Sequence, residues 1–352
     1  MADDLYRVER ALRDAAGLRL SPDDLGELVS RCIATVVPHE SLNLGGVNPA
    51  TGIISMGLWH RGHPPLRLAQ RLAAYQREDL FPPLDLAGRE LPVSIVHAAG
   101  VDGPASQASP AARVLAEHGV GSELVMMVRD STRVWGALSL LREAGARPFD
   151  SHDTQLLLAL VPSLITVVRG YVRATPLPTI RPALAPGVIV VGPDHSVRAI
   201  SPQARAWLRE LQLPRAIHGE WAATAVASEI SMVARQPNRY QRGLTPLVCM
   251  PAAYAGHWVA AHAQPLDERC DGDIAVVIQA ATGELLLPAL SAWYGLTARE
   301  RTVLDRLCDG SAPKQIARSL GLSTHTVNDH LKALFRKTNT SGRQELMAAV
   351  GV

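Results

Sequence analysis

Polar side chains near the C-terminal end of the chain recur at the spacing of one helix face: His325, Asp329, Lys332 and Arg336. Thr324 and Asn328 flank this face. An Asn side chain can bond adenine, a carboxylate can accept from cytosine N4, and basic side chains can bond guanine or phosphate. The same residues would also form the solvated face of any amphipathic helix, so the surrounding segment must decide between the two interpretations.

Start and stop signals around this face predict a set of short helices. Thr297 and Glu300 have the spacing of a capping box, and Gly310 ends the helix that they begin. Gly321 makes a tight turn, and Ser323 is the expected N-cap of the helix that carries the polar face. The opposite side of that helix is an apolar stripe of Val327, Leu331, Leu334 and Phe335. This pattern predicts a compact helical domain with a helix-turn-helix at its centre.

Positive charge is concentrated in the same segment. Residues 293–352 contain nine basic and five acidic side chains, a net charge of +4, whereas the whole chain carries +2. The rest of the chain is therefore weakly negative. A basic segment with a helix-turn-helix pattern favours the phosphate backbone of DNA as the partner.

The ordered motifs of this segment resemble the LuxR-type helix-turn-helix of bacterial transcription regulators. The matching pieces are LTARE at 296–300, KQIA at 314–317, Leu322-Ser323, Thr326-Val327, His330-Leu331, Lys337 and RQEL at 343–346. The resemblance implies an all-α four-helix domain over residues 296–352, with the third helix in the major groove. It also implies that the fourth helix, residues 344–350, takes part in dimerisation.

The resemblance implies that the family's base- and backbone-contacting positions fall on Asn328, Asp329 and Lys332. Asn328, Asp329 and Lys332 are expected to face bases, and His325 lies on the same face. Independently of the resemblance, four further residues are expected to contact phosphates: Lys314, Thr324, Arg336 and Lys337.

The segment departs from the family pattern in two places. Many relatives carry a basic residue where Asn328 stands, and Asp329 is acidic, so a changed base preference is expected. Ala312 and Pro313 replace the usual capping side chains before the second helix, a loss that typically costs about 1 kcal/mol. Ser311 is a candidate substitute for that cap.

The whole chain has the length and composition of a soluble protein with two or three domains. It has 352 residues, and no uninterrupted apolar run reaches the roughly 20 residues that span a bilayer. Four scattered cysteines and an acidic start indicate a cytoplasmic protein without a signal peptide or membrane partner. We expect no metal, no cofactor and no catalytic residues, because no ligand spacing, phosphate loop or nucleophile motif has a supporting context.

The pattern over residues 21–173 is helix, hairpin, helix, hairpin and closing helix. The helices are expected at 25–37, 66–80 and 153–173, and the hairpins join 41–48 to 52–60 and 124–129 to 133–142. This order resembles a GAF domain, most clearly in GSEL at 121–124, WGALSL at 135–140 and PFDSHD at 148–153. The family implies an α/β sensor but names no ligand.

A Pro-rich linker at 174–186 separates this part from a second α+β pattern at 187–282. Its strands are expected at 187–191, 197–201, 257–263 and 274–279, with helices at 202–211 and within 215–240. This order resembles a PAS-like domain. A helix expected at 1–20 precedes the first sensor, and one within 283–295 connects the second sensor to the C-terminal domain, either as a lever or as a rigid spacer.

The sequence therefore predicts a multidomain α+β chain that acts as a one-component DNA-binding transcription regulator rather than an enzyme. Double-stranded DNA and a second copy of the chain are the expected partners. RNA polymerase is a further candidate partner, and a small-molecule effector is a candidate ligand of either sensor. Two alternatives stay open. The sensors could act only as protein-interaction scaffolds, or the chain could be a GAF-based enzyme with a regulatory tail, which would need reactive cysteines beyond Cys32.

Overall fold

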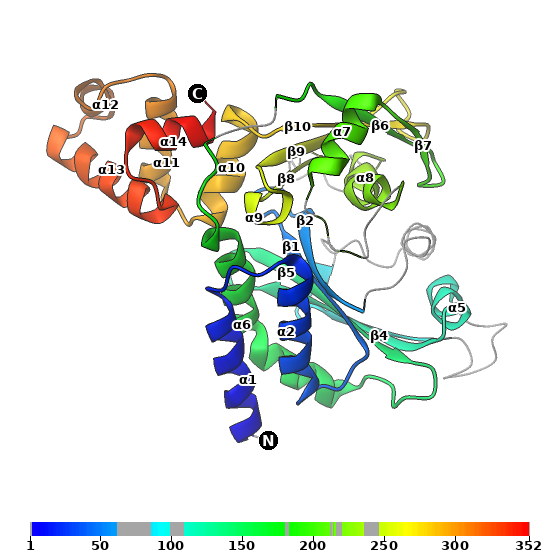
Figure 1. Cartoon of the computed structure of the whole chain (residues 1–352). Helices are drawn as coiled ribbons and strands as arrows, with labels where there is room; N and C mark the ends of the chain where they lie inside the picture. Colours follow the sequence, from blue (N-terminus) through cyan, green and yellow to red (C-terminus); the bar gives the residue numbers. More distant parts are fainter. Residues whose placement is uncertain are drawn as a thin grey trace.

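The computed structural model contains two antiparallel sheets and a separate helical unit at the C-terminal end (Figure 1). It describes residues 2–61, 86–98, 109–179, 183–211, 213, 215, 220–235 and 246–351. The helix expected at 66–80 lies outside these residues. The mixed α+β composition that the sequence predicts is confirmed.

The first sheet has five strands in the order β2-β1-β5-β4-β3. Its strands are β1 (Ser41–Val47), β2 (Ile54–His60), β3 (Val93–His97), β4 (Val120–Arg129) and β5 (Val134–Glu143). Both predicted hairpins are confirmed, because β1 pairs with β2 and β4 pairs with β5, each antiparallel. The edge strand β3 was not predicted from the sequence.

Two helices cover one face of this sheet: α2 (Pro22–Ala34) and α6 (Ser151–Ala174). A third helix, α1 (Ala2–Ala15), packs against both of them and shares their apolar core. The shorter α5 (Pro110–Glu117) packs against β3 and β4. Asp150 caps α6 by accepting from the backbone N–H groups of His152 and Asp153. A buried ion pair between Arg142 and Asp153, 3.0 Å apart, ties the end of β5 to the start of α6. The start of this closing helix is therefore fixed to the sheet.

The helix α6 is long and apolar enough to cross a bilayer by length and composition alone. In the structure it lies along α1 and the first sheet. Leu157, Leu160 and Leu164 are fully buried in the shared core. Core helices of soluble proteins commonly have this composition, so α6 is weak support for a membrane span.

The second sheet has the strand order β7-β6-β10-β9-β8. Its strands are β6 (Gly187–Val191), β7 (Val197–Ile200), β8 (Leu247–Met250), β9 (Val259–Pro265) and β10 (Ile274–Ala280). The accompanying helices are α7 (Pro202–Glu210), α8 (Glu220–Arg235) and the single turn α9 (Ala252–Ala255). The predicted hairpin at 187–201 is confirmed.

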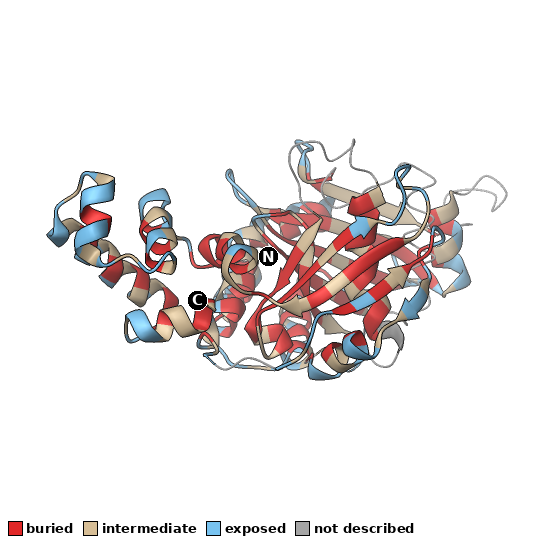
Figure 2. Ribbon diagram, turned by 90° about the horizontal axis from the view of Figure 1, so that it is seen from above, coloured by how far each residue is buried: buried red, intermediate tan, exposed pale blue. Residues whose placement is uncertain are grey.

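The two sheets repeat one topology, since each has its second strand at one edge and its fifth strand at the centre. They are also packed together. The Tyr171 hydroxyl of α6 donates to the Ala253 carbonyl at 2.7 Å. Ile53, from the connection between β1 and β2, lies in the core of the second sheet. Figure 2 shows buried residues running through both sheets and the inner sides of the helices.

Five helices complete the chain: α10 (Gly283–Trp293), α11 (Ala298–Cys308), α12 (Pro313–Leu320), α13 (Thr324–Thr338) and α14 (Arg343–Val350). The predicted connecting helix is thus α10, and the predicted four-helix unit is α11–α14. The apolar core of the first sheet continues through Trp293 of α10 into Val303 and Leu334 of the helical unit. The C-terminal unit is therefore packed onto the rest of the chain by way of α10.

Candidate nucleic-acid interface

The first helix of the C-terminal unit begins at the capping box that the sequence predicts. The Glu300 N–H donates to Thr297 Oγ1 at 3.2 Å, and the Thr297 N–H donates to Glu300 Oε2 at 2.7 Å. Gly310, which follows α11, adopts a positive φ of 82°. This left-handed conformation suits glycine, so the helix ends where expected.

A tight turn joins α12 to α13. Gly321 has φ 64° and ψ 32°, the left-handed conformation that a helix C-cap requires. The Leu322 N–H donates to the Ala317 carbonyl at 2.9 Å, and Ser323 Oγ accepts from the Thr326 N–H at 3.1 Å. These bonds fix the angle at which the chain enters α13. The predicted N-cap at Ser323 is confirmed.

The start of α12 lacks a side-chain acceptor, as expected from Ala312. Gln315 compensates in part, because its Oε1 accepts from the Ala312 N–H at 2.8 Å. The compensating residue is therefore Gln315 within the helix, whereas Ser311 was the candidate from sequence.

The inner face of α13 anchors it to the other helices. Val327 and Leu334 are fully buried, and Leu331 is nearly so. They share a core with Leu304 of α11 and Ile316 of α12. Burial of large aliphatic side chains contributes about 1.5–3 kcal/mol each, so this face holds the helix in place.

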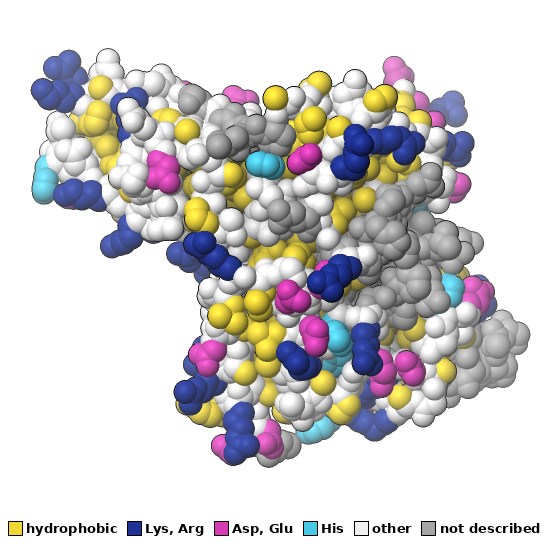
Figure 3. All heavy atoms as spheres, in the orientation of Figure 1, with side chains coloured by type: hydrophobic (Ala, Val, Ile, Leu, Met, Phe, Trp, Pro, Cys, Tyr) yellow, Lys and Arg dark blue, Asp and Glu magenta, His cyan; other side chains and the backbone are white. Residues whose placement is uncertain are grey.

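The outer face of α13 is exposed over four turns: Thr324, His325, Asn328, Asp329, Lys332 and Arg336 are all solvent-accessible. Lys314 of α12 is exposed as well. Figure 1 shows α12 and α13 at the left end of the molecule, with α10 between them and the second sheet. Figure 3 shows Lys and Arg side chains along the outer rim of this unit. The structure thus brings seven of the eight predicted contact residues to solvent on the same helical unit.

Asp329 lies between two groups that can carry positive charge. Its carboxylate is 3.5 Å from His325 Nε2 and 3.8 Å from Lys332 Nζ. All three side chains are more than half exposed, so these contacts contribute little to stability. The carboxylate and the ammonium group remain available to a partner that approaches the helix.

Lys337 is the predicted contact residue that the structure places elsewhere. Its Nζ donates to Glu300 Oε2 at 2.6 Å and to the Gly295 carbonyl at 2.9 Å, and its side chain is only 24% exposed. Although burial opposes it, the bonds from Lys337 and Thr297 lower the pKa of Glu300. This ammonium group therefore joins the last turn of α13 to the start of α11. Nothing local in the sequence signals a pair whose members lie 37 positions apart.

The fourth helix, expected to support dimerisation, directs its apolar residues into its own chain. Leu346 and Val350 are fully buried, and α14 packs against α10 and α13. Arg343 and Gln344 lie on its exposed side. Any contact with a second copy through this helix would therefore use its polar side.

Comparison with known proteins identifies this unit. Residues 295–350 match the family described as bacterial regulatory proteins, luxR family. The chain is 41% identical over 90 residues to the transcriptional regulatory protein UhpA of Escherichia coli, covering 23% of this chain and 46% of that protein. It is 40% identical over 62 residues to the monoamine regulon transcriptional regulator of Klebsiella aerogenes, covering 18% and 25%. The C-terminal unit is therefore a LuxR-type helix-turn-helix domain.

The chain spans less than half the length of these curated relatives. Among solved structures, a bacteriophytochrome from R. palustris, RpBphP3, aligns with 79% of this chain and 62% of its own length. The TM-score is 0.30 at 12% identity, a likeness too low to assign the fold of either sheet.

Proposed function

We propose that this chain is a one-component transcription regulator that places the outer face of α13 in the major groove of DNA. The observation that carries the proposal is the row of exposed polar side chains on a helix fixed by a capped turn and a buried inner face. The sequence match of residues 295–350 supports the same role. A helix held in this way is the usual reader of B-DNA in helix-turn-helix proteins.

The exposed contact residues are proposed to fall into two groups, those that contact bases and those that contact phosphates. Asn328, Asp329 and Lys332 occupy the middle of the outer face, where base edges would lie. Thr324 and Arg336 lie toward the two ends of this face, Lys314 lies on α12, and all three suit phosphate contacts. Lys337 is bound to Glu300, so its proposed phosphate contact would require that ion pair to open. The proposal includes a homodimer on DNA and cytoplasmic action, with RNA polymerase as a further partner.

The two sheet units are proposed as GAF-like and PAS-like sensors. Support comes from the face of the first sheet opposite α2 and α6, where Ser139 Oγ donates to Glu123 Oε1 at 2.8 Å. Asn43 is paired with Ser139 in register, so it lies on the same face. Its side-chain oxygen is buried without a hydrogen-bond partner among the described residues. Buried polar groups of this kind are commonly satisfied by water or a ligand.

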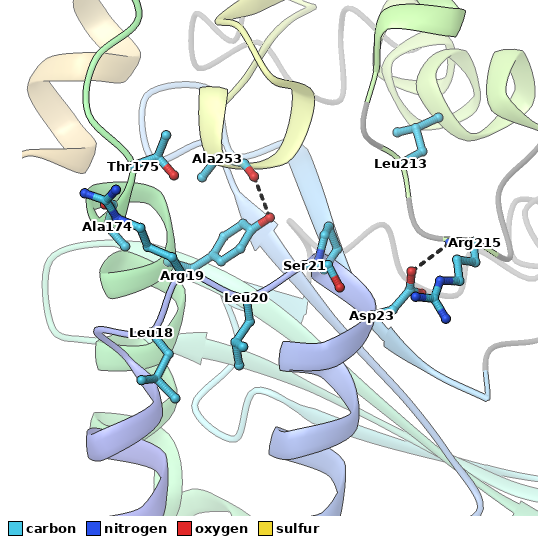
Figure 4. A pocket seen from close by; sticks show the side chains of 12 residues that line it. Leu18, Arg19, Leu20, Ser21, Asp23, Ala174, Thr175, Leu213, Arg215 and Ala253 are labelled. Carbon is cyan, nitrogen blue, oxygen red and sulfur yellow. Dashed lines mark hydrogen bonds between the residues drawn. The ribbon is translucent and has the colours of Figure 1, made fainter.

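A pocket at the junction of the two sensors also has the size of a small-molecule site. Its volume is about 480 Å³, within the range that ligand pockets occupy. Figure 4 shows Arg19 and Leu20 from the α1–α2 connection lining it together with Leu213 and Ala253 from the second unit. A ligand bound here would contact both sensor units at once.

The DNA-binding proposal is tested by selection from a pool of random duplexes with the full chain at two salt concentrations. We expect a common sequence with two related half-sites, bound more weakly at high salt. A pool that yields no common sequence at either salt concentration would overturn the proposal. Native mass spectrometry of the same preparation separates sensing from scaffolding, since a co-purified small molecule supports sensing and bare protein supports scaffolding.

A further inference from the structure

Three side chains from different parts of the chain meet where the first sheet contacts α10. The rings of Trp135 and Trp293 lie 5.9 Å apart at 52°, and the Arg169 guanidinium carbon is 4.4 Å from the centre of the Trp135 ring. Trp135 is the second residue of β5, Arg169 lies near the end of α6, and Trp293 ends α10. We call these three residues the tryptophan junction. It joins the first sensor to the helix that carries the DNA-binding domain.

Arg169 places a positive charge in this junction. Arg169 is half-buried, and its Nε is buried without a hydrogen-bond partner among the described residues. The Asp130 carboxylate attracts this guanidinium group, whereas Arg133 and Arg173 repel it. Burial lowers the pKa of this guanidinium group. Placing a cation here costs desolvation, which the face of Trp135 offsets only in part. The stacking of Arg169 on Trp135 joins α6 to β5 at this point.

The hydrogen bonds of Trp135 attach the junction to the β4–β5 turn. Its Nε1 donates to Asp130 Oδ2 at 2.7 Å, and Asp130 Oδ1 accepts from Thr132 and Arg133. The position of the Trp135 ring therefore depends on the conformation of this hairpin turn.

Gly295 connects the junction to α13. It has a positive φ of 65°, and a Cβ at this position would lie 3.3 Å from Arg169 Nη2. Its carbonyl accepts from Lys337 Nζ at 2.9 Å, and Lys337 belongs to the last turn of α13. The path from the β4–β5 turn to α13 thus runs from Asp130 through Trp135 to Trp293. It then follows the chain for two residues to Gly295, whose carbonyl is bound by Lys337.

We infer that the tryptophan junction sets the orientation of the DNA-binding domain, and that movement of the β4–β5 hairpin changes this orientation. The inference rests on the proposed DNA-binding function and names its regulation. The outer face of α13 is already exposed, so the junction does not act by covering it. Its effect is on geometry, because two recognition helices in a dimer must match the spacing of two half-sites.

The first test needs no DNA. Amide hydrogen exchange of residues 286–297 is compared in the full chain for wild type, Arg169→Ala and Arg169→Lys. We expect exchange about tenfold faster in Arg169→Ala, with Arg169→Lys intermediate because Lys lacks the planar stacking group. Arg205→Ala removes an exposed Arg of α7 and is the matched control, with unchanged exchange. Equal exchange in wild type and Arg169→Ala would overturn the junction as a fixed contact.

The second test reads the half-site spacing in the duplexes selected by the same proteins. We expect wild type and Arg205→Ala to select one spacing, and Arg169→Ala to select the same half-sites over a wider range of spacings. Mere destabilisation would reduce the bound fraction and leave the spacing unchanged. Faster exchange with an unchanged spacing would overturn the orienting role. Absence of any selected site in wild type would instead reject the DNA-binding proposal, while the exchange result would still decide whether the contact is fixed.

Discussion

The outer and inner faces of α13 differ in the kind of residue and in what surrounds it. Lys332 and His325 on the outer face are 77% and 86% exposed, whereas Val327 and Leu334 on the inner face are fully buried. The inner face stabilises the domain, and the outer face contributes almost nothing to its stability. Recognition and stability are therefore located on separate faces of one helix, and substitutions on each should affect one property only.

The largest effect is expected on the inner face. Leu334→Ala should destabilise the C-terminal domain by about 3 kcal/mol, because it removes a fully buried side chain and leaves a cavity. The measurement is hydrogen-exchange protection of α11–α13 in the full chain. His325→Ala on the outer face is the control and should change protection by less than about 0.5 kcal/mol. Similar losses in the two variants would remove the distinction between the faces.

Lys337 and Lys332 allow a direct comparison of a bound and an exposed lysine, since they lie five positions apart on the same helix. Lys337→Ala should destabilise the domain by about 2 kcal/mol, because it breaks bonds to Glu300 and Gly295. Lys332→Ala is the matched control, with no measurable loss. Urea unfolding, monitored by exchange protection, compares the stability of the two variants. An unchanged stability of Lys337→Ala would mean that the ion pair is not formed in solution.

The Glu300–Lys337 pair also predicts a pH dependence. Because the pKa of Glu300 is lower in the folded chain than in the unfolded chain, its contribution is fully present above about pH 4.3 and is lost as the pH falls below that value. The stability difference between wild type and Lys337→Ala should therefore shrink below about pH 4. A difference that grows with acidity would contradict this assignment.

On the outer face, substitutions are expected to change the affinity for DNA. Lys332→Ala should weaken binding of a selected duplex about tenfold, the loss of one good contact to a base or phosphate. Fluorescence anisotropy at fixed salt measures the change, with Arg205→Ala as the control for loss of an exposed cation. Unchanged affinity in Lys332→Ala would remove this lysine from the interface.

The smallest change in affinity is expected for Asp329→Ala. The carboxylate is 3.8 Å from Lys332 and repels phosphate, so its loss should change the overall affinity by less than about threefold. The selected sequence should change instead, with relaxed preference at the position where the carboxylate accepts from cytosine N4. An identical selected sequence would show that Asp329 reads no base.

Local signals in the sequence were sufficient to predict the C-terminal domain. The caps at Thr297 and Ser323 and the turn at Gly321 depend only on residues within a few positions, and the structure confirms all three. The hairpins of both sheets were predicted for the same reason, because alternation and turn residues are adjacent in the chain.

Contacts between distant residues could not be predicted in this way. The ion pair of Lys337 with Glu300 and the stacking of Trp135 on Trp293 join positions whose proximity depends on the finished fold. The edge strand β3 was also missed, since its neighbour in the sheet is β4 and its own five residues carry no turn signal. Six of the eight contact residues were chosen from helical periodicity, which predicts the face of a residue but not its hydrogen-bond partners. Lys314 and Lys337 were added as candidate phosphate contacts outside that periodic face.

Photocrosslinking of the full chain to a selected duplex tests the central claim most directly. A benzophenone side chain replaces Asn328 on the outer face of α13 or, as a control, exposed Arg205 of α7. If the outer face of α13 lies in the major groove, the substitution at 328 should give a DNA adduct within the selected sequence, and the substitution at 205 should give none. Adducts of equal yield at both positions, or none at 328 while the protein remains bound, would contradict the account.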